Sequence, residues 1–282
     1  MEKRKQKLKY YPSQAAFVVG EEVVTGYPSG CPRNILFASY GIRTESIPEV
    51  YQTVGAMNEL RHQADLLADS SIVEAEAEVP VRGPIYGSDT VEYSGRIDFW
   101  VTHEDGTEVP HECKATVSRA GFQSMKRNAA PKVNHLAQLV SYMLQTETQD
   151  AQLVYGYYQY PWSIDHDAPN LECTDSVTFD VRIEDSGTIT VGGKPTIYTA
   201  QDQLKHMQLA VKTLTENKLT NRPASENAWS NPCNLCPFSN TCDKVDAGLT
   251  DLEEILMSAE EDITKVEERE PKIFRPKRRP KK

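Results

Sequence analysis

Two carboxylates and a lysine lie on the arms of one predicted hairpin, residues 93–118. Asp98 is on the first arm, and Glu112 and Lys114 are on the second. Two carboxylates held close together repel each other unless a cation lies between them, and Mg²⁺ or Mn²⁺ prefers such oxygen ligands. A lysine beside the ion can hold or activate a water molecule, or neutralise a developing negative charge. These residue types therefore indicate phosphodiester hydrolysis, with an ordinary pair of cross-strand surface charges as the plain alternative.

The length of the hairpin turn decides whether the two carboxylates meet. A two-residue turn at residues 105–106 would pair Glu104 with Thr107. Asp98 would then face Cys113, and the carboxylate of the second arm would point to the other side of the sheet.

A three-residue turn over residues 104–106 gives the productive register. It places a glycine at the third position, where a left-handed backbone is needed, and pairs His103 with Thr107. Asp98 is then directly opposite Glu112, with Cβ atoms roughly 4.5–5.5 Å apart. The lysine two residues further on shares their face. We favour this register.

A second group of residues indicates a metal centre of another kind. In "NPCNLCPFSNTC", Cys233 and Cys236 are separated by two residues, and Cys242 follows after five more. Four ligands are normal for tetrahedral zinc or a 4Fe–4S cluster. His206 on a preceding helix could complete a zinc site, and Cys31 could complete an all-cysteine site. The spacing alone does not choose between them.

The elements that must position these groups follow from hydrophobic periodicity and turn signals. Residues 13–45 include an irregular stretch, and the elements after it predict a mixed central sheet flanked by helices, an α/β fold. The near-continuous bulk of residues 151–160 predicts a strand buried on both faces. The predicted helices are residues 46–70, 131–147 and 198–218, and the predicted strands are residues 71–81, 90–102, 107–115 and 151–160, with peripheral strands at 176–183 and 188–193.

Composition sets limits on the class of protein. The chain has 282 residues, of which 39% are hydrophobic and 26% are charged, as in soluble globular proteins. It contains no apolar run of membrane-spanning length, and its basic N-terminus lacks the apolar core of a secretory signal, so we expect a cytoplasmic protein without membrane contact.

The net charge of −10 is unevenly spread. Residues 1–10 carry five basic residues and one acidic residue, and residues 271–282 carry seven basic residues and no acidic one. The acidic body between them argues against broad coating of duplex DNA, but it is compatible with a narrow channel for one strand.

Taken together, the motifs resemble those of a known nuclease superfamily. Gly95–Asp98 reads G-x-x-D and Glu112-x-Lys114 reads E-x-K, as in the PD-(D/E)xK nucleases. Gln138–Tyr142 is similar to the Q-x-x-x-Y motif of the RecB-like branch. An early cysteine followed by a late C-x-x-C-x(5)-C resembles the iron–sulfur members of that branch, the CRISPR-associated exonucleases of the fourth Cas family and exonuclease V.

The resemblance implies a fold and an activity. The fold is a restriction-endonuclease-like core with a cysteine-ligated iron–sulfur subdomain that joins the two ends of the chain. The activity is a Mg²⁺- or Mn²⁺-dependent DNA exonuclease that prefers single strands or DNA ends and runs 5′ to 3′. Recombination, repair and CRISPR spacer processing all use this chemistry. The enzyme would act on DNA alone or as part of a recombination or CRISPR integration complex. The alternative is a DNA-binding or adaptor subunit whose nuclease acts only inside a larger complex.

The resemblance also assigns roles to residues around the predicted hairpin. Asp98 and Glu112 bind the catalytic metal, together with the backbone carbonyl of Cys113. Lys114 positions or activates the attacking water.

Further roles fall on the helices. Gln138 and Tyr142 lie four residues apart, on one helix face, and would orient the lysine or the DNA strand. The earlier helix offers Glu59 as a third metal ligand through G-x-x-x-E, with His62, one turn later on the same face, as the alternative. The cluster ligands would be Cys31, Cys233, Cys236 and Cys242.

The domain boundaries follow from these assignments. Residues 1–12 are expected to form a basic flexible arm, and residues 13–245 the nuclease core. The iron–sulfur subdomain combines Cys31 with residues 225–245. Residues 246–282 are expected to be a disordered acidic linker and basic tail. Lys126 and Arg127 precede the glutamine helix and are candidates for DNA phosphate contacts.

Overall fold

The computed structural model describes residues 8–24, 31–41, 49–85, 88–159, 172–217, 236, 238–246 and 272–274. The strands are β1 (Leu8–Tyr10), β2 (Phe17–Val19), β3 (Glu22–Val24), β4 (Ile72–Pro84), β5 (Val91–His103), β6 (Glu108–Thr116), β7 (Asp150–Tyr158), β8 (Cys173–Ile183), β9 (Thr188–Val191), β10 (Lys194–Thr199) and β11 (Lys272–Phe274). The helices are α1 (Pro32–Ser39), α2 (Glu49–Ala68), α3 (Arg119–Asn128), α4 (Val133–Thr146), α5 (Ala200–Glu216) and α6 (Ser239–Asp246), with a short 3₁₀ turn, η1, at Pro12–Gln14.

Nine of these strands form one mixed sheet in the order β10-β9-β8-β7-β6-β5-β4-β11, with β1 beside β5. The β6–β7 and β1–β5 pairs are parallel, and the other pairs of this sheet are antiparallel. The prediction of a mixed central sheet flanked by helices is therefore confirmed.

The hairpin β5–β6 has the three-residue turn that places the carboxylates together. The backbone N–H of His103 donates to the carbonyl of Thr107 at 2.9 Å, and the ladder continues in this register to Phe99 opposite His111. Gly106 has φ +83°, a conformation that favours glycine. The predicted register is confirmed, because the turn chemistry and the alternation of the strands agree.

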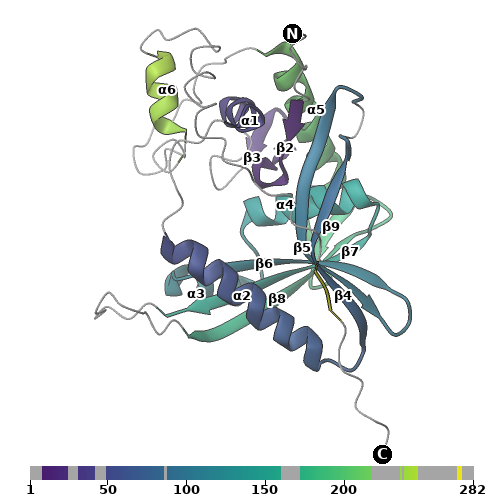
Figure 1. The fold of residues 1–282 in the computed structure, drawn as a ribbon. Helices are drawn as coiled ribbons and strands as arrows, with labels where there is room; N and C mark the ends of the chain where they lie inside the picture. Colours follow the sequence, from purple (N-terminus) through teal and green to yellow (C-terminus); the bar gives the residue numbers. More distant parts are fainter. Residues whose placement is uncertain are drawn as a thin grey trace, which may run out of the picture.

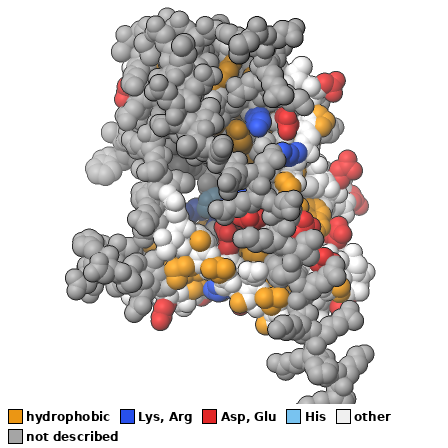
Figure 2. Space-filling model, viewed as in Figure 1, with side chains coloured by type: hydrophobic (Ala, Val, Ile, Leu, Met, Phe, Trp, Pro, Cys, Tyr) orange, Lys and Arg blue, Asp and Glu red, His pale blue; other side chains and the backbone are white. Residues whose placement is uncertain are grey.

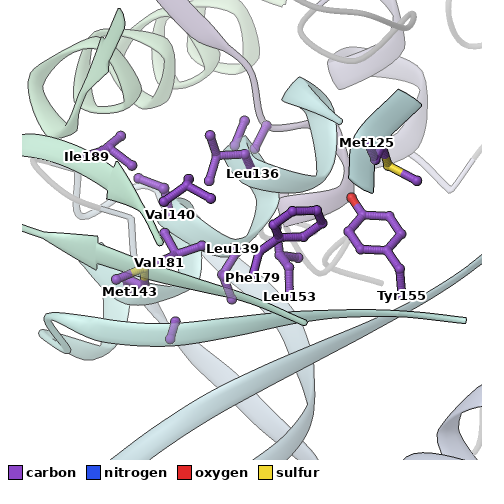
Figure 3. Close-up of a cluster of buried hydrophobic side chains, with 14 of the residues drawn as sticks. Met125, Leu136, Leu139, Val140, Met143, Leu153, Tyr155, Phe179, Val181 and Ile189 are labelled. Carbon is purple, nitrogen blue, oxygen red and sulfur yellow. The ribbon is translucent and has the colours of Figure 1, made fainter. Parts of the chain in front are cut away.

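Helices cover the sheet on both faces (Figure 1). On one face, α4 packs on β7, β8 and β9 through a cluster that Figure 3 draws, including Leu139, Met143, Leu153 and Phe179. On the other face, α2 packs on β4–β7 through Leu66. The α1 and α5 helices enclose a further cluster around β5 and β1.

The strand β7 lies in the middle of this arrangement and is buried on both faces. Leu153 and Tyr155 belong to the cluster under α4, and Val154 belongs to the cluster under α2. This explains why its sequence is almost continuously bulky, and it confirms that prediction.

Among the helices absent from the predicted element order are α1 and α3. The stretch that was expected to be irregular contains α1, which begins with Pro32 at its first position and buries Ile35 and Leu36. The segment before α4 contains α3, whose N-cap Ser118 accepts a hydrogen bond from the Gly121 N–H. Both helices are short, and a short amphipathic segment gives little periodic signal.

Both ends of the described chain add strands to the sheet. Within the expected flexible arm, β1 pairs with β5, and Tyr10 is fully buried. Within the expected disordered tail, β11 pairs with Ala75–Ala77 of β4. Residues 1–7, 247–271 and 275–282 lie outside the described residues. Among the described helices, none combines the length and apolar character needed to cross a membrane.

His206 lies in the core, against the N-terminal strand. It is fully buried on α5, and its Nδ1 lies 3.4 Å from the hydroxyl of Tyr10. Burial lowers the pKa of His206 to about 4. A neutral, packed imidazole explains this residue without a metal.

This burial predicts an acid-sensitive contribution to stability. Because the folded pKa of His206 lies below the unfolded value, its contribution is complete above about pH 6.5 and is lost as pH falls towards 4. Between pH 7 and pH 5 the loss is about 2 kcal/mol. Urea unfolding of His206→Gln should therefore show a smaller drop in unfolding free energy over this range than the wild type. The control is His103→Gln, at the half-buried end of β5, whose unfolding free energy should drop as much as that of the wild type. An equal drop in the wild type and both variants would contradict this prediction.

Candidate active site

The strands β5 and β6 separate where the candidate residues lie. Their last rung joins Phe99 and His111, after which β5 continues along β4 and β6 continues along β7. At this point the backbone N–H of Cys113 donates to Asp98 Oδ2 at 2.7 Å. A carboxylate thus takes the place of the next rung, and the opened sheet leaves room for side chains from both helix layers.

Glu112 is almost completely buried, with 2% of its side chain exposed. Its Oε1 accepts hydrogen bonds from Lys114 Nζ at 2.5 Å and from Gln138 Nε2 at 2.7 Å. Its Oε2 is buried and has no hydrogen-bond partner among the described residues. Burial and the nearby Asp98 carboxylate raise the pKa of Glu112 to about 8. Such a group needs either a proton or a cation at neutral pH.

Burial and neighbouring charges also shift the pKa values of Asp98 and Lys114, the other two members of the predicted motif. Burial raises the pKa of Asp98, although Lys114 opposes this shift. Burial works against a charge on Lys114, but the carboxylates of Glu112 and Asp98 raise its pKa above the ordinary value. Lys114 is therefore an ammonium ion at neutral pH, suited to hold a water molecule or to stabilise negative charge rather than to accept a proton.

The structure separates the two alternatives on α2. Glu59 is half-buried, and burial, with Asp98 and Glu78 as the nearest negative charges, raises its pKa to about 7. His62 instead lies with its Nε2 2.9 Å from His111 Nδ1, and burial lowers its pKa to about 4. Glu59 thus shares the electrostatic environment of the carboxylates, whereas His62 forms a neutral histidine pair. A ligand role for Glu59 stays a prediction.

Gln138 reaches the site from α4, on the opposite helix layer. Its amide donates to Glu112, and its backbone carbonyl accepts a hydrogen bond from Ser141 at 2.8 Å. Ser141 in turn lies 2.9 Å from the hydroxyl of Tyr93. Gln138 was expected to orient the lysine or the DNA, and in the structure it orients the carboxylate that the lysine also contacts.

Tyr142 acts on the backbone of β5. Its hydroxyl donates to the carbonyl of Arg96 at 2.7 Å and accepts from the Arg96 N–H at 3.2 Å. One hydroxyl therefore satisfies both backbone groups, as a neighbouring strand would. The ring passes so close to Gly95 that a Cβ there would lie 2.7 Å from it. The glycine of G-x-x-D and the tyrosine of Q-x-x-x-Y are thus one structural unit that supports Asp98.

The oxygen ligands of the site suit a hard divalent ion. Among the described residues, no three His, Cys, Asp or Glu side chains are arranged as a metal-binding group. Glu112 offers a buried oxygen without a partner, and Asp98 lies beside it. The Lys114 ammonium supplies the positive charge at this place. Asp98 and Glu112 are therefore the described carboxylates that would hold Mg²⁺ or Mn²⁺.

Three of the four predicted cluster cysteines are described. Cys31 is the residue that precedes the first turn of α1, and Cys242 lies on α6. The two helices pack through Phe37 and Phe238, with Cys236 and Cys242 in the same cluster. Cys233 lies outside the described residues. The packing brings the early and the late cysteine segments to one region, but within the described residues it forms no metal-binding group.

The predicted DNA-contacting residues lie on α3. Lys126 donates to both carboxylate oxygens of Asp175 at 2.8 and 2.9 Å, so its charge is partly compensated. Arg127 is exposed in the last turn. DNA contact by either residue stays a prediction, as does metal binding by the carbonyl of Cys113.

Sequence reasoning missed three residues around the site. Asn58 of α2 is fully buried and donates to the carbonyl of Lys114 at 3.2 Å. Glu78 and Arg96 lie next to Asp98 and are 3.8 Å apart. The alternation of Glu with Ala in residues 74–78 is typical of a solvent-facing strand edge, so no signal marked Glu78.

Comparisons with known proteins find similar structures but do not assign the chain to a family. No protein-family model and no curated protein sequence matches the chain. The crystal structure of SSO0001 is 18% identical and covers 86% of this chain and 89% of its own, with a TM-score of 0.46. The alkaline exonuclease LHK-Exo from Laribacter hongkongensis is 14% identical and covers 75% of this chain and 90% of its own, with a TM-score of 0.47. A phage-related exonuclease from Haemophilus somnus is 11% identical and covers 66% of this chain and 80% of its own, with a TM-score of 0.41. At these values none of them assigns this chain to a family or an activity.

Proposed function

We propose that the chain is a divalent-metal-dependent deoxyribonuclease that acts on single strands or DNA ends. The observation that carries this proposal is the convergence of Asp98, Glu112 and Lys114 where β5 and β6 separate, with one buried carboxylate oxygen left without a partner among the described residues. Phosphodiester hydrolysis needs an activated water and a positive environment for the phosphate, and these groups are suited to supply both.

The chain's own residues would share the work as follows. Asp98 and Glu112, with Glu59, would hold Mg²⁺ or Mn²⁺, which lowers the pKa of bound water and offsets charge on the phosphate. Lys114 would hold the attacking water or stabilise the negative charge that develops on the phosphate. Gln138 would keep Glu112 in position.

The charge distribution supports a strand or an end as substrate. Figure 2 shows more acidic than basic side chains on the visible described surface. Such a surface does not favour broad contact with a duplex, because phosphate contacts supply most of non-specific DNA affinity. The motif resemblance favours 5′-to-3′ polarity and a role in recombination, repair or CRISPR spacer processing.

We also propose a 4Fe–4S cluster on Cys31, Cys233, Cys236 and Cys242, with zinc as the alternative metal. The packing of α1 on α6 supports this assignment, as does Arg33, which donates to Asp246 at 2.8 Å and hydrogen-bonds Cys242. Anaerobically purified protein should be brown and absorb near about 400 nm if iron–sulfur is present, and colourless with zinc.

The function is tested with end-labelled single-stranded and duplex DNA in the presence of Mg²⁺ or Mn²⁺. The wild type should degrade single strands or ends, and the label position gives the polarity. Lys114→Met should lose at least about 100-fold in rate. Lys212→Met, which removes an exposed lysine from α5, should retain wild-type activity. A folded wild type that binds metal but leaves all DNA intact would contradict the proposal and would favour the adaptor role.

Gln138 provides a milder, graded prediction. Gln138→Ala should lower activity or metal affinity by about 10- to 100-fold, because Glu112 loses one of the donors that hold it. The measurement is the Mg²⁺ dependence of the degradation rate. Gln145→Ala on the same helix, where the amide donates to the carbonyl of Pro84, should change neither value. Equal loss in both variants would indicate a general effect on α4.

A further inference from the structure

A cavity of about 710 Å³ begins one residue after Lys114. Its walls are the end of β6, the helix α3 and the beginning of α4, and we call it the α3–α4 cavity. Thr116, which lines it, lies on the same face of β6 as Glu112 and Lys114, because side chains alternate along a strand. The volume falls within the range of ligand-binding cavities, about 300–1,000 Å³.

The beginning of α4 is held beside Lys114. Tyr155 of β7 is opposite Lys114 in the β6–β7 ladder, and its hydroxyl accepts a hydrogen bond from the backbone N–H of Lys132 at 3.3 Å. The same hydroxyl lies 2.9 Å from Nδ1 of His135. The wall of the cavity that Lys132 forms is therefore fixed at the rung that carries the lysine of the candidate active site.

One segment supplies the entire described lining, and its charge differs from that of the rest of the chain. Residues 113–146 form the longest part of the chain without an aspartate or a glutamate. They contain five basic residues, although the whole chain has a net charge of −10. Lys132 is the basic residue of this segment that lines the cavity. Unlike Lys126, which is paired with Asp175, it forms no ion pair within the part of the chain that the structure describes.

The lining suits the backbone of a nucleic acid better than its bases. Among the described residues that line the cavity, none is acidic and none is aromatic. The polar side chains carry hydroxyl, amide or ammonium donors, and they belong to Thr116, Ser118, Ser124, Asn128, Lys132 and Asn134. Such groups bind phosphate oxygens and sugars, whereas the bases of a single strand stack on aromatic side chains.

A second cavity has the opposite charge. It has a volume of about 390 Å³ and lies at the end of the β5–β6 hairpin that carries the turn. Its lining includes one arginine and four carboxylates, which are Asp105, Asp150, Asp180 and Glu184. A polyanion would be repelled there, so the α3–α4 cavity is the one of these two that suits a DNA strand.

We propose that the α3–α4 cavity binds the sugar–phosphate backbone of single-stranded DNA on one side of the bond that is cut, with Lys132 and Ser124 as phosphate contacts. A strand bound there reaches Lys114 at the end of the cavity, so its next phosphate lies at the candidate metal site. The inference rests on the proposed function in taking a DNA strand as the ligand, and it adds the place where that strand lies.

The test measures binding and needs no hydrolysis. The probe is a short fluorescein-labelled oligothymidylate, with Ca²⁺ in place of Mg²⁺, and binding is followed by fluorescence anisotropy over a series of KCl concentrations. Lys132→Gln should weaken binding about tenfold, because a hydrogen bond to a charged group is lost. The slope of log K against log[KCl] should become shallower by about 0.7, the value for one phosphate contact on a single strand. Lys194→Gln, on the exposed beginning of β10, should change neither value.

A second variant adds a negative charge to the cavity. Ser124→Asp keeps an acceptor for the Asn128 amide, which donates to Ser124 Oγ at 3.3 Å, so α3 should remain folded. It should weaken binding at least about tenfold, because a carboxylate then faces the phosphates. Ser186→Asp, in the exposed turn between β8 and β9, should bind as the wild type does. Thermal melting of all four variants confirms that each is folded.

The inference would be overturned if the wild type failed to bind the oligonucleotide, or if Lys132→Gln and Ser124→Asp kept its affinity and salt dependence. Losses of the same size in the two control variants would also overturn it. If the cavity variants lose binding but the wild type degrades no DNA with Mg²⁺ or Mn²⁺, the binding site stands and the proposed function fails. If the wild type degrades DNA while the cavity variants bind normally, the proposed function stands and the inference fails.

Discussion

Asp98→Asn should lose at least about 1000-fold in DNA degradation, since this corresponds to about 4 kcal/mol of transition-state stabilisation. Asp98 and Glu112 would hold the proposed cation together, so the substitution removes one of its ligands. The asparagine can keep the hydrogen bond from the Cys113 N–H, because its side-chain oxygen replaces Oδ2. The loss should therefore appear in the rate of product formation at saturating Mg²⁺, with the fold intact.

Two controls make this result specific. Asp105→Asn, in the exposed turn of the same hairpin, should retain full activity. In metal-free buffer, Asp98→Asn should be at least as stable as the wild type, because a buried negative charge next to Glu112 has been removed. Activity within about tenfold of the wild type, a barrier change of about 1.4 kcal/mol, would exclude Asp98 as a metal ligand.

Gly156→Ala should destabilise the protein by about 3–4 kcal/mol, from overpacking and a disrupted buried hydrogen bond. A Cβ at Gly156 would lie 2.1 Å from Asn58 Oδ1, which has no room to retreat because Asn58 is fully buried. Asn58 donates to the carbonyl of Lys114 and so fixes α2 against β6. Urea unfolding measures the loss directly.

The matched control is Gly55→Ala on α2, where a Cβ meets nothing within 4 Å. This change should stabilise the helix by about 0.5–1 kcal/mol. In an Asn58→Ala background, Gly156→Ala should cost less, because the closest clash is absent and only the contact with Tyr158 Cε2 at 2.9 Å remains. A full cost in that background would locate the strain elsewhere.

The part of the site that could be predicted depended on local rules. The turn at residues 104–106 determined the pairing of β5 with β6, and alternation then placed Asp98, Glu112 and Lys114 on one face. The turn type and the strand alternation depend only on residues that are close in sequence, so both could be predicted without the fold. The same applies to α2, α4 and the doubly buried β7, whose patterns are long enough to read.

The remaining part depended on contacts between distant segments. That Tyr142 satisfies the backbone of Arg96 follows from the separation of β5 and β6, which no local pattern encodes. The position of Glu78 depends on one left-handed residue inside a strand. The different surroundings of Glu59 and His62 follow from the docking of α2, which places His111 within reach of His62. Tertiary packing, rather than propensity, decided each of these.

The turn at residues 104–106 has a consequence for variation in chain length. It is exposed and about five residues, roughly 17 Å, from Asp98, and it carries none of the proposed metal ligands. Substitutions that tolerate its backbone shape leave the site unchanged. Loss or gain of a single residue there is different, because it shifts one arm against the other and turns Glu112 and Lys114 away from Asp98. The exposed loop therefore tolerates substitutions but not insertions or deletions. The number of residues in it determines whether the site residues face one another.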